Sequence, residues 1–132
     1  MGLTIKSLDH LVLRVGDLEG MVAFYRDVIG LSVERRQDGI GLVQLRAGTQ
    51  LVDLVAVDSP LGRMGGVGPG GEGRNLDHFC LNVEDFDLAA VTAHLASHGV
   101  VVGDSGQRYG AGGLGLSVYL SDPEGNGLEL RG

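Results

Sequence analysis

The chain has 132 residues, of which 43% are hydrophobic and 20% are charged, so we expect a globular protein with a real core rather than a disordered one. Ten Lys and Arg residues against seventeen Asp and Glu residues give a formal net charge of −7, and such a surface would repel a nucleic-acid backbone or an anionic bilayer. The sequence has no long apolar run and no basic-then-apolar leader ahead of the first expected strand. We therefore expect a cytoplasmic protein with neither nucleic-acid nor membrane partners.

One short pattern occurs twice in the chain. Residues 8–17 read LDHLVLRVGD and residues 76–85 read LDHFCLNVED, and the histidines lie 78 − 10 = 68 positions apart, about half the chain. In both stretches large apolar residues alternate with others, as in a half-buried strand, which predicts His10 and His78 on the face away from the apolar row. One histidine so placed is usually structural. Two at equivalent positions would converge if the two copies pair about a pseudo-twofold axis.

Residues 1–58 are predicted to form a βαβββ module. Asp17 is placed to cap a helix whose apolar residues recur at spacings of three and four, and Gly30 is placed to end it. Strands and turns then alternate, with strands expected at 31–36, 40–46 and 50–57 and turns at 37–39 and 47–49.

Residues 59–74 contain seven glycines and two prolines, so we expect them to hold no regular element and to connect the two modules. Residues 75–132 should repeat the βαβββ order, as part of one compact domain overall. Here Asp85 is expected to cap the helix, Gly99 to end it, and residues 106–115 to form a flexible loop. Strands are expected at 75–83, 100–102, 116–121 and 127–131, with a turn at 122–126 before the last of them.

The single cysteine, Cys80, excludes an intrachain disulfide and lies in the middle of an expected strand. A reduced thiol in such a place usually packs as a small core residue. The alternative is a catalytic thiol, because His78 shares its face, but a thiolate needs an electropositive environment that the sequence does not provide. Packing is the favoured interpretation.

Two carboxylates also occupy equivalent positions. Asp53 lies between two apolar residues in the last strand of the first module, and Glu129 does so in the last strand of the second. The sequence thus offers His10 with Asp53 and His78 with Glu129. A single such carboxylate is usually a solvated charge, whereas two imidazoles and two carboxylates form a ligand set for a divalent ion such as Zn, Ni, Co, Mn or Fe.

Taken together, these features resemble the vicinal oxygen chelate superfamily, which contains glyoxalase I, extradiol dioxygenases, fosfomycin-resistance thiol transferases and bleomycin-resistance proteins. The resemblance covers the whole chain and implies an α+β fold of two tandem βαβββ modules that form incompletely closed barrels, with a metal cleft between paired modules. It rests on the residues of 8–15, on Phe24-Tyr25 with Ile29-Gly30-Leu31, on His78 in its strand, and on the turn 122–126 leading into 128–130.

The resemblance implies that His10, His78 and Glu129 hold the metal. Glyoxalase I adds a fourth ligand, a glutamate, and that position is Asp53 here, one methylene shorter. The implied reaction is proton transfer on a hemithioacetal, with metal-stabilised enediolate chemistry. In that reaction Glu129 would be the catalytic base and Asp53 its counterpart.

The same resemblance implies that Arg14 binds the carboxylate of glutathione, a possible co-substrate. Arg108 and Tyr109 are further candidates for substrate binding, because they lie in the expected loop of the second module. Small βαβββ modules leave one sheet face open, so the modules should pair within a chain or across a homodimer. The leading hypothesis is a metal-dependent, glyoxalase I-like lyase (lactoylglutathione lyase type).

Three other functions remain open, because Val57 stands where glyoxalase I keeps an asparagine. The first is thiol addition to an epoxide, as in fosfomycin resistance. The second is ligand sequestration of the bleomycin-resistance type, although such proteins line their cleft with aromatics and this chain has no Trp, three Phe and three Tyr. The third is oxygen-dependent ring cleavage by a dioxygenase.

Overall fold

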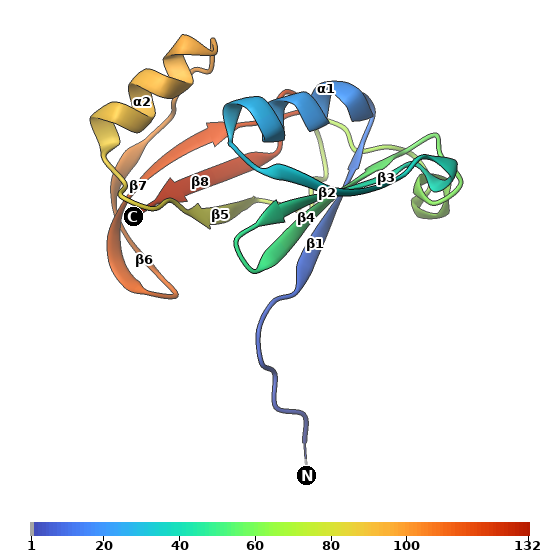
Figure 1. Cartoon of the computed structure of the whole chain (residues 1–132), viewed down its shortest axis with the longest axis horizontal. Coiled ribbons are helices and arrows are strands. Elements are labelled where there is room, and N and C mark those ends of the chain that lie inside the picture. Colours follow the sequence, from blue (N-terminus) through green and yellow to red (C-terminus); the bar gives the residue numbers. More distant parts are fainter. Residues whose placement is uncertain (1) are drawn as a thin grey trace. The chain divides into compact units, whose positions relative to one another are not determined.

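A computed structural model describes residues 2–132, which form two compact units (Figure 1). One unit ends at Pro69 and the other begins at Gly70, so the boundary lies inside the connector predicted at 59–74. No helix within residues 2–132 has the length and apolar character needed to cross a membrane.

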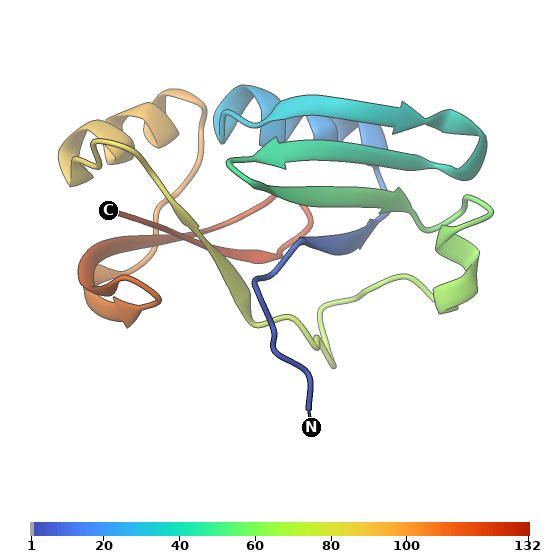
Figure 2. The ribbon, with the colours of Figure 1, turned by 60° about the horizontal axis from the view of Figure 1, so that its bottom comes forward.

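The first unit is a βαβββ module, as predicted. Its sheet has the strand order β1-β4-β3-β2, in which β1 runs parallel to β4 and the other pairs are antiparallel (Figure 2). The helix α1 packs against β4. The elements are β1 (His10–Val15), α1 (Leu18–Ala23), β2 (Ser32–Gln37), β3 (Leu42–Ala47) and β4 (Gln50–Ala56).

The second unit repeats this topology with the strand order β5-β8-β7-β6, and its helix α2 packs against β7. Both sheets are open, so the molecule is an α+β protein with two four-stranded mixed sheets, which confirms the predicted fold class. The elements are β5 (His78–Asn82), α2 (Leu88–Ser97), β6 (Ser105–Gly110), β7 (Gly113–Ser121) and β8 (Gly127–Arg131).

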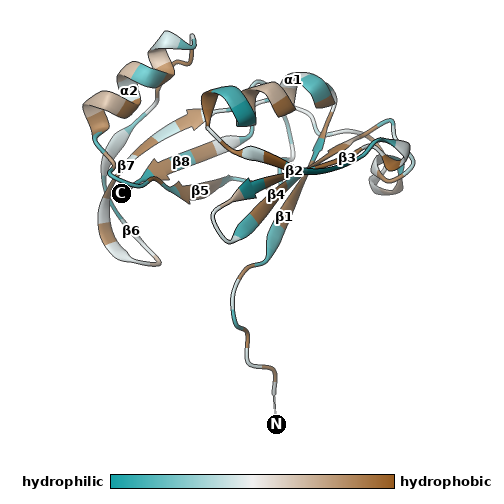
Figure 3. Ribbon diagram, viewed as in Figure 1, coloured by the Kyte–Doolittle hydropathy of each residue, from teal (hydrophilic) through white to brown (hydrophobic). Residues whose placement is uncertain are grey.

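Each sheet has an apolar face and a more polar face, because side chains alternate along a strand. In β1, Leu13 and Val15 are buried while Val12 is half exposed. In β8, Leu128 and Leu130 are buried on the core side. Figure 3 shows the resulting bands of hydrophilic and hydrophobic colour along the strands.

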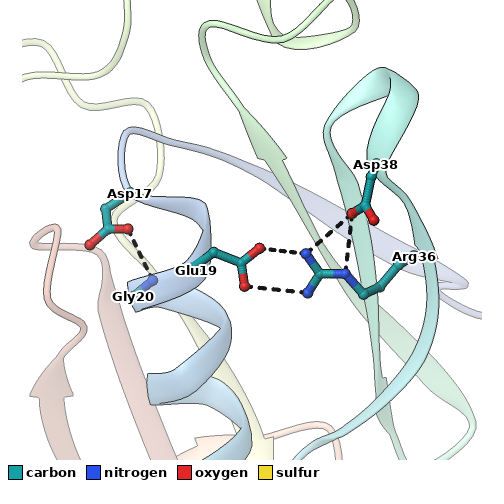
Figure 4. A network of polar contacts seen from close by, with 5 residues as sticks. All are labelled: Asp17, Glu19, Gly20, Arg36 and Asp38. Carbon is teal, nitrogen blue, oxygen red and sulfur yellow. Dashed lines mark hydrogen bonds and ion pairs between the residues drawn. The ribbon is translucent and has the colours of Figure 1, made fainter.

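The helix α1 begins where the sequence predicts, because the Asp17 carboxylate accepts a hydrogen bond from the Gly20 amide at 3.0 Å (Figure 4). On the same helix, the Glu19 carboxylate forms an ion pair with the Arg36 guanidinium of β2, which also contacts Asp38. These contacts tie the start of α1 to the end of β2.

Gly30 ends that helix as predicted, with a positive φ of 95°, but the geometry of the last turns differs from the expectation. Regular α-helix stops at Ala23 and continues as a π-helical turn over Phe24–Val28, with the Ile29 amide bonded to the Phe24 carbonyl at 3.1 Å. The wider turn buries the adjacent Phe24 and Tyr25 together, in edge-to-face contact with ring centroids 5.2 Å apart. A regular helix would separate two neighbouring side chains by about 100° and could not point both into one core so well.

The connector also differs from the expectation, because Gly62–Gly65 forms a short 3-10 helix. The Arg14 guanidinium holds this turn, donating to the Gly62 carbonyl from Nε at 3.2 Å and from Nη2 at 3.0 Å, and also to the carbonyls of Gly66 and Val67. A Cβ on Gly62 would lie 1.8 Å from the Ala56 carbonyl oxygen. Glycine therefore serves close packing here, and the expectation of no regular element was wrong.

In the second unit, Asp87 rather than Asp85 caps the helix, accepting from the Ala90 amide at 3.0 Å. Asp85 instead has a positive φ of 51° in the preceding turn. Residues 106–115, expected to be a loop, belong mostly to β6 and to the start of β7, while residues 100–102 form no strand. The glycines that suggested flexibility here make room for a neighbouring side chain.

Candidate metal centre

The first unit brings His10 and Asp53 to the polar face of its sheet. Asp53 lies in β4 opposite Val12 of β1, and its side chain is buried, with an exposed fraction of 3% for the residue. Gln44 of β3 donates to Asp53 Oδ2 at 3.2 Å, whereas Asp53 Oδ1 is buried and has no hydrogen-bond partner in the described part of the chain. A buried carboxylate oxygen without a donor is costly, and a cation would satisfy it.

The imidazole of His10 is oriented by the residue before it. His10 Nδ1 lies 2.7 Å from Asp9 Oδ1, so this nitrogen carries the proton that is donated to the carboxylate. That hydrogen bond, together with the negative charge of Asp53, raises the pKa of His10 above its ordinary value. Because Nδ1 is engaged, Nε2 is the nitrogen available as a ligand, an arrangement usual for metal-binding histidines.

The second unit repeats this arrangement. His78 Nδ1 lies 2.6 Å from Asp77 Oδ2, and His78 Nε2 lies 3.2 Å from Glu129 Oε1. The hydrogen bond to Asp77, followed by the charges of Asp77 and Glu129, raises the pKa of His78. Both ring nitrogens of His78 therefore face carboxylates, and a metal ion bound at Nε2 would replace the contact with Glu129.

Glu129 lies in β8 opposite Tyr119 of β7, and the residue is only 6% exposed. Its Oε2 accepts a hydrogen bond from the Ser117 hydroxyl at 2.6 Å. Burial by itself would raise the pKa of Glu129, but hydrogen bonds from Ser117 and Tyr119 and the charge of His78 hold it below its usual range. The carboxylate is therefore ionised at neutral pH.

Cys80 lies opposite Glu129 on β5, on the exposed side of the strand, so the expectation that it packs in the core was wrong. Partial desolvation and the adjacent Glu129 carboxylate raise the pKa of its thiol to about 11. At neutral pH the thiol is therefore protonated and a weak nucleophile, which disfavours a catalytic role.

Each unit carries one imidazole and one carboxylate at matching positions. Val12 pairs with Asp53 just as Cys80 pairs with Glu129, so the two carboxylates occupy the same place in their sheets. Each unit supplies one imidazole fixed by its neighbouring aspartate and one buried carboxylate held by the third strand of its sheet. Nitrogen and oxygen donors of this kind suit a divalent ion. Within residues 2–132 no group of three or more His, Cys, Asp or Glu side chains is arranged to hold a metal.

The three predicted substrate-binding residues lie in different settings. Arg14 uses four hydrogen bonds to hold the connector turn. Arg108 lies on the Glu129 side of its sheet, 5.6 Å from the centroid of the Tyr119 ring and ion-paired with Asp104 at 2.7 Å. Tyr109, the next residue in β6, points to the opposite face and is 84% exposed.

Several polar residues of these half-sites were missed in the sequence. The repeated LDH pattern contained a signal for two of them, because an aspartate precedes the histidine in both copies. The others lie on strands next to the carboxylates, and only the strand registers reveal them. The missed residues are Asp9, Gln44, Asp77, Ser117 and Tyr119.

Comparisons with known proteins agree with this fold. The model of the family described as Glyoxalase/Bleomycin resistance protein/Dioxygenase superfamily matches residues 7–130. The chain is 33% identical over 129 residues to the glyoxalase domain-containing protein RDO1 of Mycosarcoma maydis, covering 97% of this chain and 69% of that protein. It is 31% identical to catechol-2,3-dioxygenase of Bacillus subtilis (strain 168), covering 89% of this chain but only 38% of the dioxygenase. Glutathione transferase FosA of Serratia marcescens is 28% identical, with coverages of 96% and 81%.

Solved structures share the architecture over nearly the whole chain. The integron cassette protein VCH_CASS1 from V. cholerae has a TM-score of 0.77 at 28% identity, covering 99% of this chain and 98% of that one. TnmS3, an antibiotic binding protein from Streptomyces sp. CB03234, has a TM-score of 0.69 at 25% identity, with 98% of both chains covered. Lactoylglutathione lyase from Agrobacterium tumefaciens has a TM-score of 0.69 at 24% identity, with coverages of 96% and 93%, a likeness of fold alone.

Proposed function

Because the chain belongs to the Glyoxalase/Bleomycin resistance protein/Dioxygenase superfamily, we propose that it is a divalent-metal-dependent lyase or isomerase of the glyoxalase I type. Its substrate would be a small molecule with two neighbouring oxygens, such as a hemithioacetal. The observation that carries the proposal is the buried Asp53 carboxylate with its unpartnered Oδ1, at the position equivalent to Glu129. A fourth ligand of this kind fits glyoxalase I chemistry better than a three-ligand dioxygenase site, which leaves more positions open for substrate oxygens.

The residues that would hold the ion are His10, His78, Glu129 and Asp53. In the first unit the donor atoms would be His10 Nε2 and the unpartnered Asp53 Oδ1, since His10 Nδ1 and Asp53 Oδ2 already have hydrogen-bond partners. In the second unit they would be His78 Nε2 and Glu129 Oε1, which face each other at 3.2 Å and would exchange that contact for the ion. When bound, a divalent ion supplies Lewis acidity that polarises the substrate oxygens.

Glu129 would act as the base that takes a proton from the substrate carbon. Ser117 and Tyr119 donate to its carboxylate, which fixes the orientation of the group and keeps it ionised at neutral pH. Asp53, held by Gln44, would receive or return the proton on the other side. Burial of both carboxylates excludes bulk water from the proton transfer.

The thiol partner of the substrate is a separate matter. Arg14, the candidate for the carboxylate of glutathione, has four of its N–H groups engaged by connector carbonyls. Glutathione is therefore a co-substrate only if another cation binds it, and a different small thiol or a free dicarbonyl would need no such contact.

The decisive experiment combines elemental analysis with turnover assays. Protein reconstituted with Ni, Co, Zn, Mn or Fe should isomerise the hemithioacetal of methylglyoxal, assayed with glutathione and with a small thiol such as 2-mercaptoethanol. Inactivity towards both thiols with every metal would refute the proposal. Consumption of glutathione against an epoxide would then assign a thiol transferase, cleavage of a catechol with oxygen a dioxygenase, and tight binding without turnover a sequestering protein.

The working form is proposed to be a homodimer, because each unit supplies one pair of the proposed ligands and exposes residues such as Val12 and Cys80 on the polar face of its sheet. Sedimentation equilibrium at micromolar concentration should give twice the mass of one chain. A monomer alone would contradict this part of the proposal.

A further inference from the structure

Arg131 is a buried cation next to the proposed base. It is the last residue of β8, two positions after Glu129, so the two side chains project from the same face of the sheet. The residue is 6% exposed, comparable to Glu129 itself. Its Nη2 donates to the Gly113 carbonyl at 2.8 Å, and among residues 2–132 no carboxylate forms an ion pair with it.

The surrounding strands are shaped to accommodate this guanidinium. A Cβ added to Gly110 would lie 1.9 Å from Arg131 Nη1, and a Cβ added to Gly115 would lie 2.4 Å from Arg131 Nη2. Any other residue at either position would displace the group. The glycines of the β6–β7 hairpin thus form a cradle for Arg131, and the polar residues Ser117 and Asn82 lie opposite it on the neighbouring strands.

The Arg131 guanidinium donates to one carbonyl, and none of its nitrogens is both buried and without a partner, so its remaining N–H groups are accessible to water or to an anion. The protein otherwise carries a net charge of −7 and offers little attraction to anions elsewhere. A planar guanidinium with free N–H groups is well suited to bind a carboxylate or phosphate with two parallel hydrogen bonds. The fixed place of Arg131 beside Glu129 therefore indicates a function in binding rather than in folding alone.

We infer that Arg131 binds an oxyanion carried by the substrate, so that the substrate class is a small carboxylate- or phosphate-bearing molecule. The Cα atoms of residues two apart on a strand are separated by about 7 Å, so Arg131 and Glu129 are close enough in the sheet for one small molecule to reach both. This inference rests on the proposed function for the identity of the reacting end. The proposal that an anion binds rests separately on Arg131 and on the glycines that surround its guanidinium.

The test compares an anion with its neutral isostere on the full chain. Pyruvate and pyruvamide have the same shape and differ in charge, and each is titrated into chelator-treated protein by calorimetry and by NMR of the arginine Nε–H groups. Pyruvate should bind about tenfold or more tightly than pyruvamide, as expected for a charge-assisted pair, and should shift the Arg131 Nε–H signal. Inorganic phosphate is titrated in parallel, and if it alone binds through Arg131, phosphate rather than carboxylate is the group recognised.

Three variants complete the test. Arg131→Gln should lower the affinity for pyruvate to that for pyruvamide, and Arg131→Lys should retain part of the difference. Arg26→Gln, which removes the same charge from an exposed local ion pair, should leave binding unchanged. Circular dichroism shows whether each variant is folded. If Arg131→Gln does not fold, the inference is decided by the pyruvate and pyruvamide titrations of the wild type and by the shift of the Arg131 Nε–H signal.

Equal affinities for pyruvate and pyruvamide, with no response to phosphate, would overturn the inference. Anion binding that survives in folded Arg131→Gln would do so too. These titrations need neither metal nor turnover, so they can be interpreted even if the lyase assay shows no activity. Conversely, a negative titration result does not change the interpretation of the lyase assay.

Discussion

Each candidate histidine owes its orientation to the residue before it. Asp9 and Asp77 accept from the Nδ1 atoms of His10 and His78, so two separate copies of the module fix the same tautomer. A hydrogen bond of this kind raises the affinity of the ring for a proton and for a metal alike, because both prefer a more basic nitrogen. The aspartates are therefore as much a part of the proposed site as the ligands.

The first prediction concerns the pKa of His78 in metal-free protein. The pKa should lie above the ordinary histidine value of 6.5, chiefly because of Asp77, and Asp77→Asn should lower it. A raised folded-state pKa means that the pairing stabilises the fold fully below the unfolded pKa and that this stability is lost as pH rises through the folded pKa. NMR titration of the imidazole measures the shift. Asp9→Asn is the control, since it should lower the pKa of His10 and leave His78 unchanged.

The second prediction concerns Glu129 as the base. Glu129→Gln keeps the volume and one ligating oxygen but cannot accept a proton, so at saturating metal, where the ion stays bound, kcat should fall by about 10²- to 10⁴-fold. Elemental analysis and turnover are measured on the same preparation. The exposed Glu84→Gln serves as the matched control. Retention of full activity in Glu129→Gln would remove Glu129 from the reaction.

The third prediction concerns the unpartnered oxygen of Asp53. Asp53→Asn removes a buried charge but keeps an acceptor for Gln44, so the metal-free variant should be more stable than wild type by about 1 kcal/mol. The same change should weaken metal binding by roughly tenfold or more, because a neutral amide is a poorer ligand. Thermal unfolding of chelator-treated protein and a metal-competition titration test both parts. Exposed Asp58→Asn should change neither, and a metal affinity unaltered in Asp53→Asn would show that Asp53 is not a ligand.

At the level of elements, the glycine-rich stretches show where sequence patterns mislead. Residues 106–115 were expected to be a loop, yet Gly110 and Gly115 lie in strands because Arg131 occupies the space above them. The 3-10 helix at Gly62–Gly65 was missed for the same reason, since the contact with Arg14 comes from a distant strand. Glycine in a sequence indicates either freedom or close packing, and only the tertiary contacts distinguish the two.

The fourth prediction tests the corrected start of α2. Asp87→Ala removes the hydrogen bond to the Ala90 amide and should lower the free energy of unfolding by about 0.5–2 kcal/mol. Asp85→Gly should not lower it, because glycine adopts the positive φ at that position without strain. Urea denaturation of the three proteins gives the comparison. If Asp85→Gly proved the more damaging change, the original expectation of an Asp85 cap would be restored.

At the level of the whole molecule, the repeat explains why so much could be predicted. The constant offset between the two copies of the repeat predicted two βαβββ modules and the equivalence of Asp53 with Glu129, whereas the order of the strands within each sheet is known only from the structure. What escaped prediction depends on contacts between strands, such as the hydroxyl of Ser117 on Glu129. A sequence repeat shows which positions of the two modules are equivalent. The side chains that hydrogen-bond to each proposed ligand depend on the register between neighbouring strands, which the repeat does not reveal.

The last prediction follows from the division of the ligand set. His10 and Asp53 belong to one unit and His78 and Glu129 to the other, so the proposed four-ligand site would need one unit of each kind, from one chain or from two. We expect two chains, because the proposed homodimer pairs each open polar face with a partner. His10→Ala and Glu129→Ala are each expected to be inactive alone, since each variant has one defective half.

Mixing the two variants after unfolding and refolding distinguishes the arrangements. If sites form across the dimer, half of the dimers are mixed and each contains one intact site, so activity and bound metal should recover to about one quarter of the wild-type value. If both halves come from the same chain, no intact site can form in the mixture and no activity returns. Refolded wild type gives the reference value. Two copies of His10→Ala refolded together give the background, because every site in that dimer lacks one histidine.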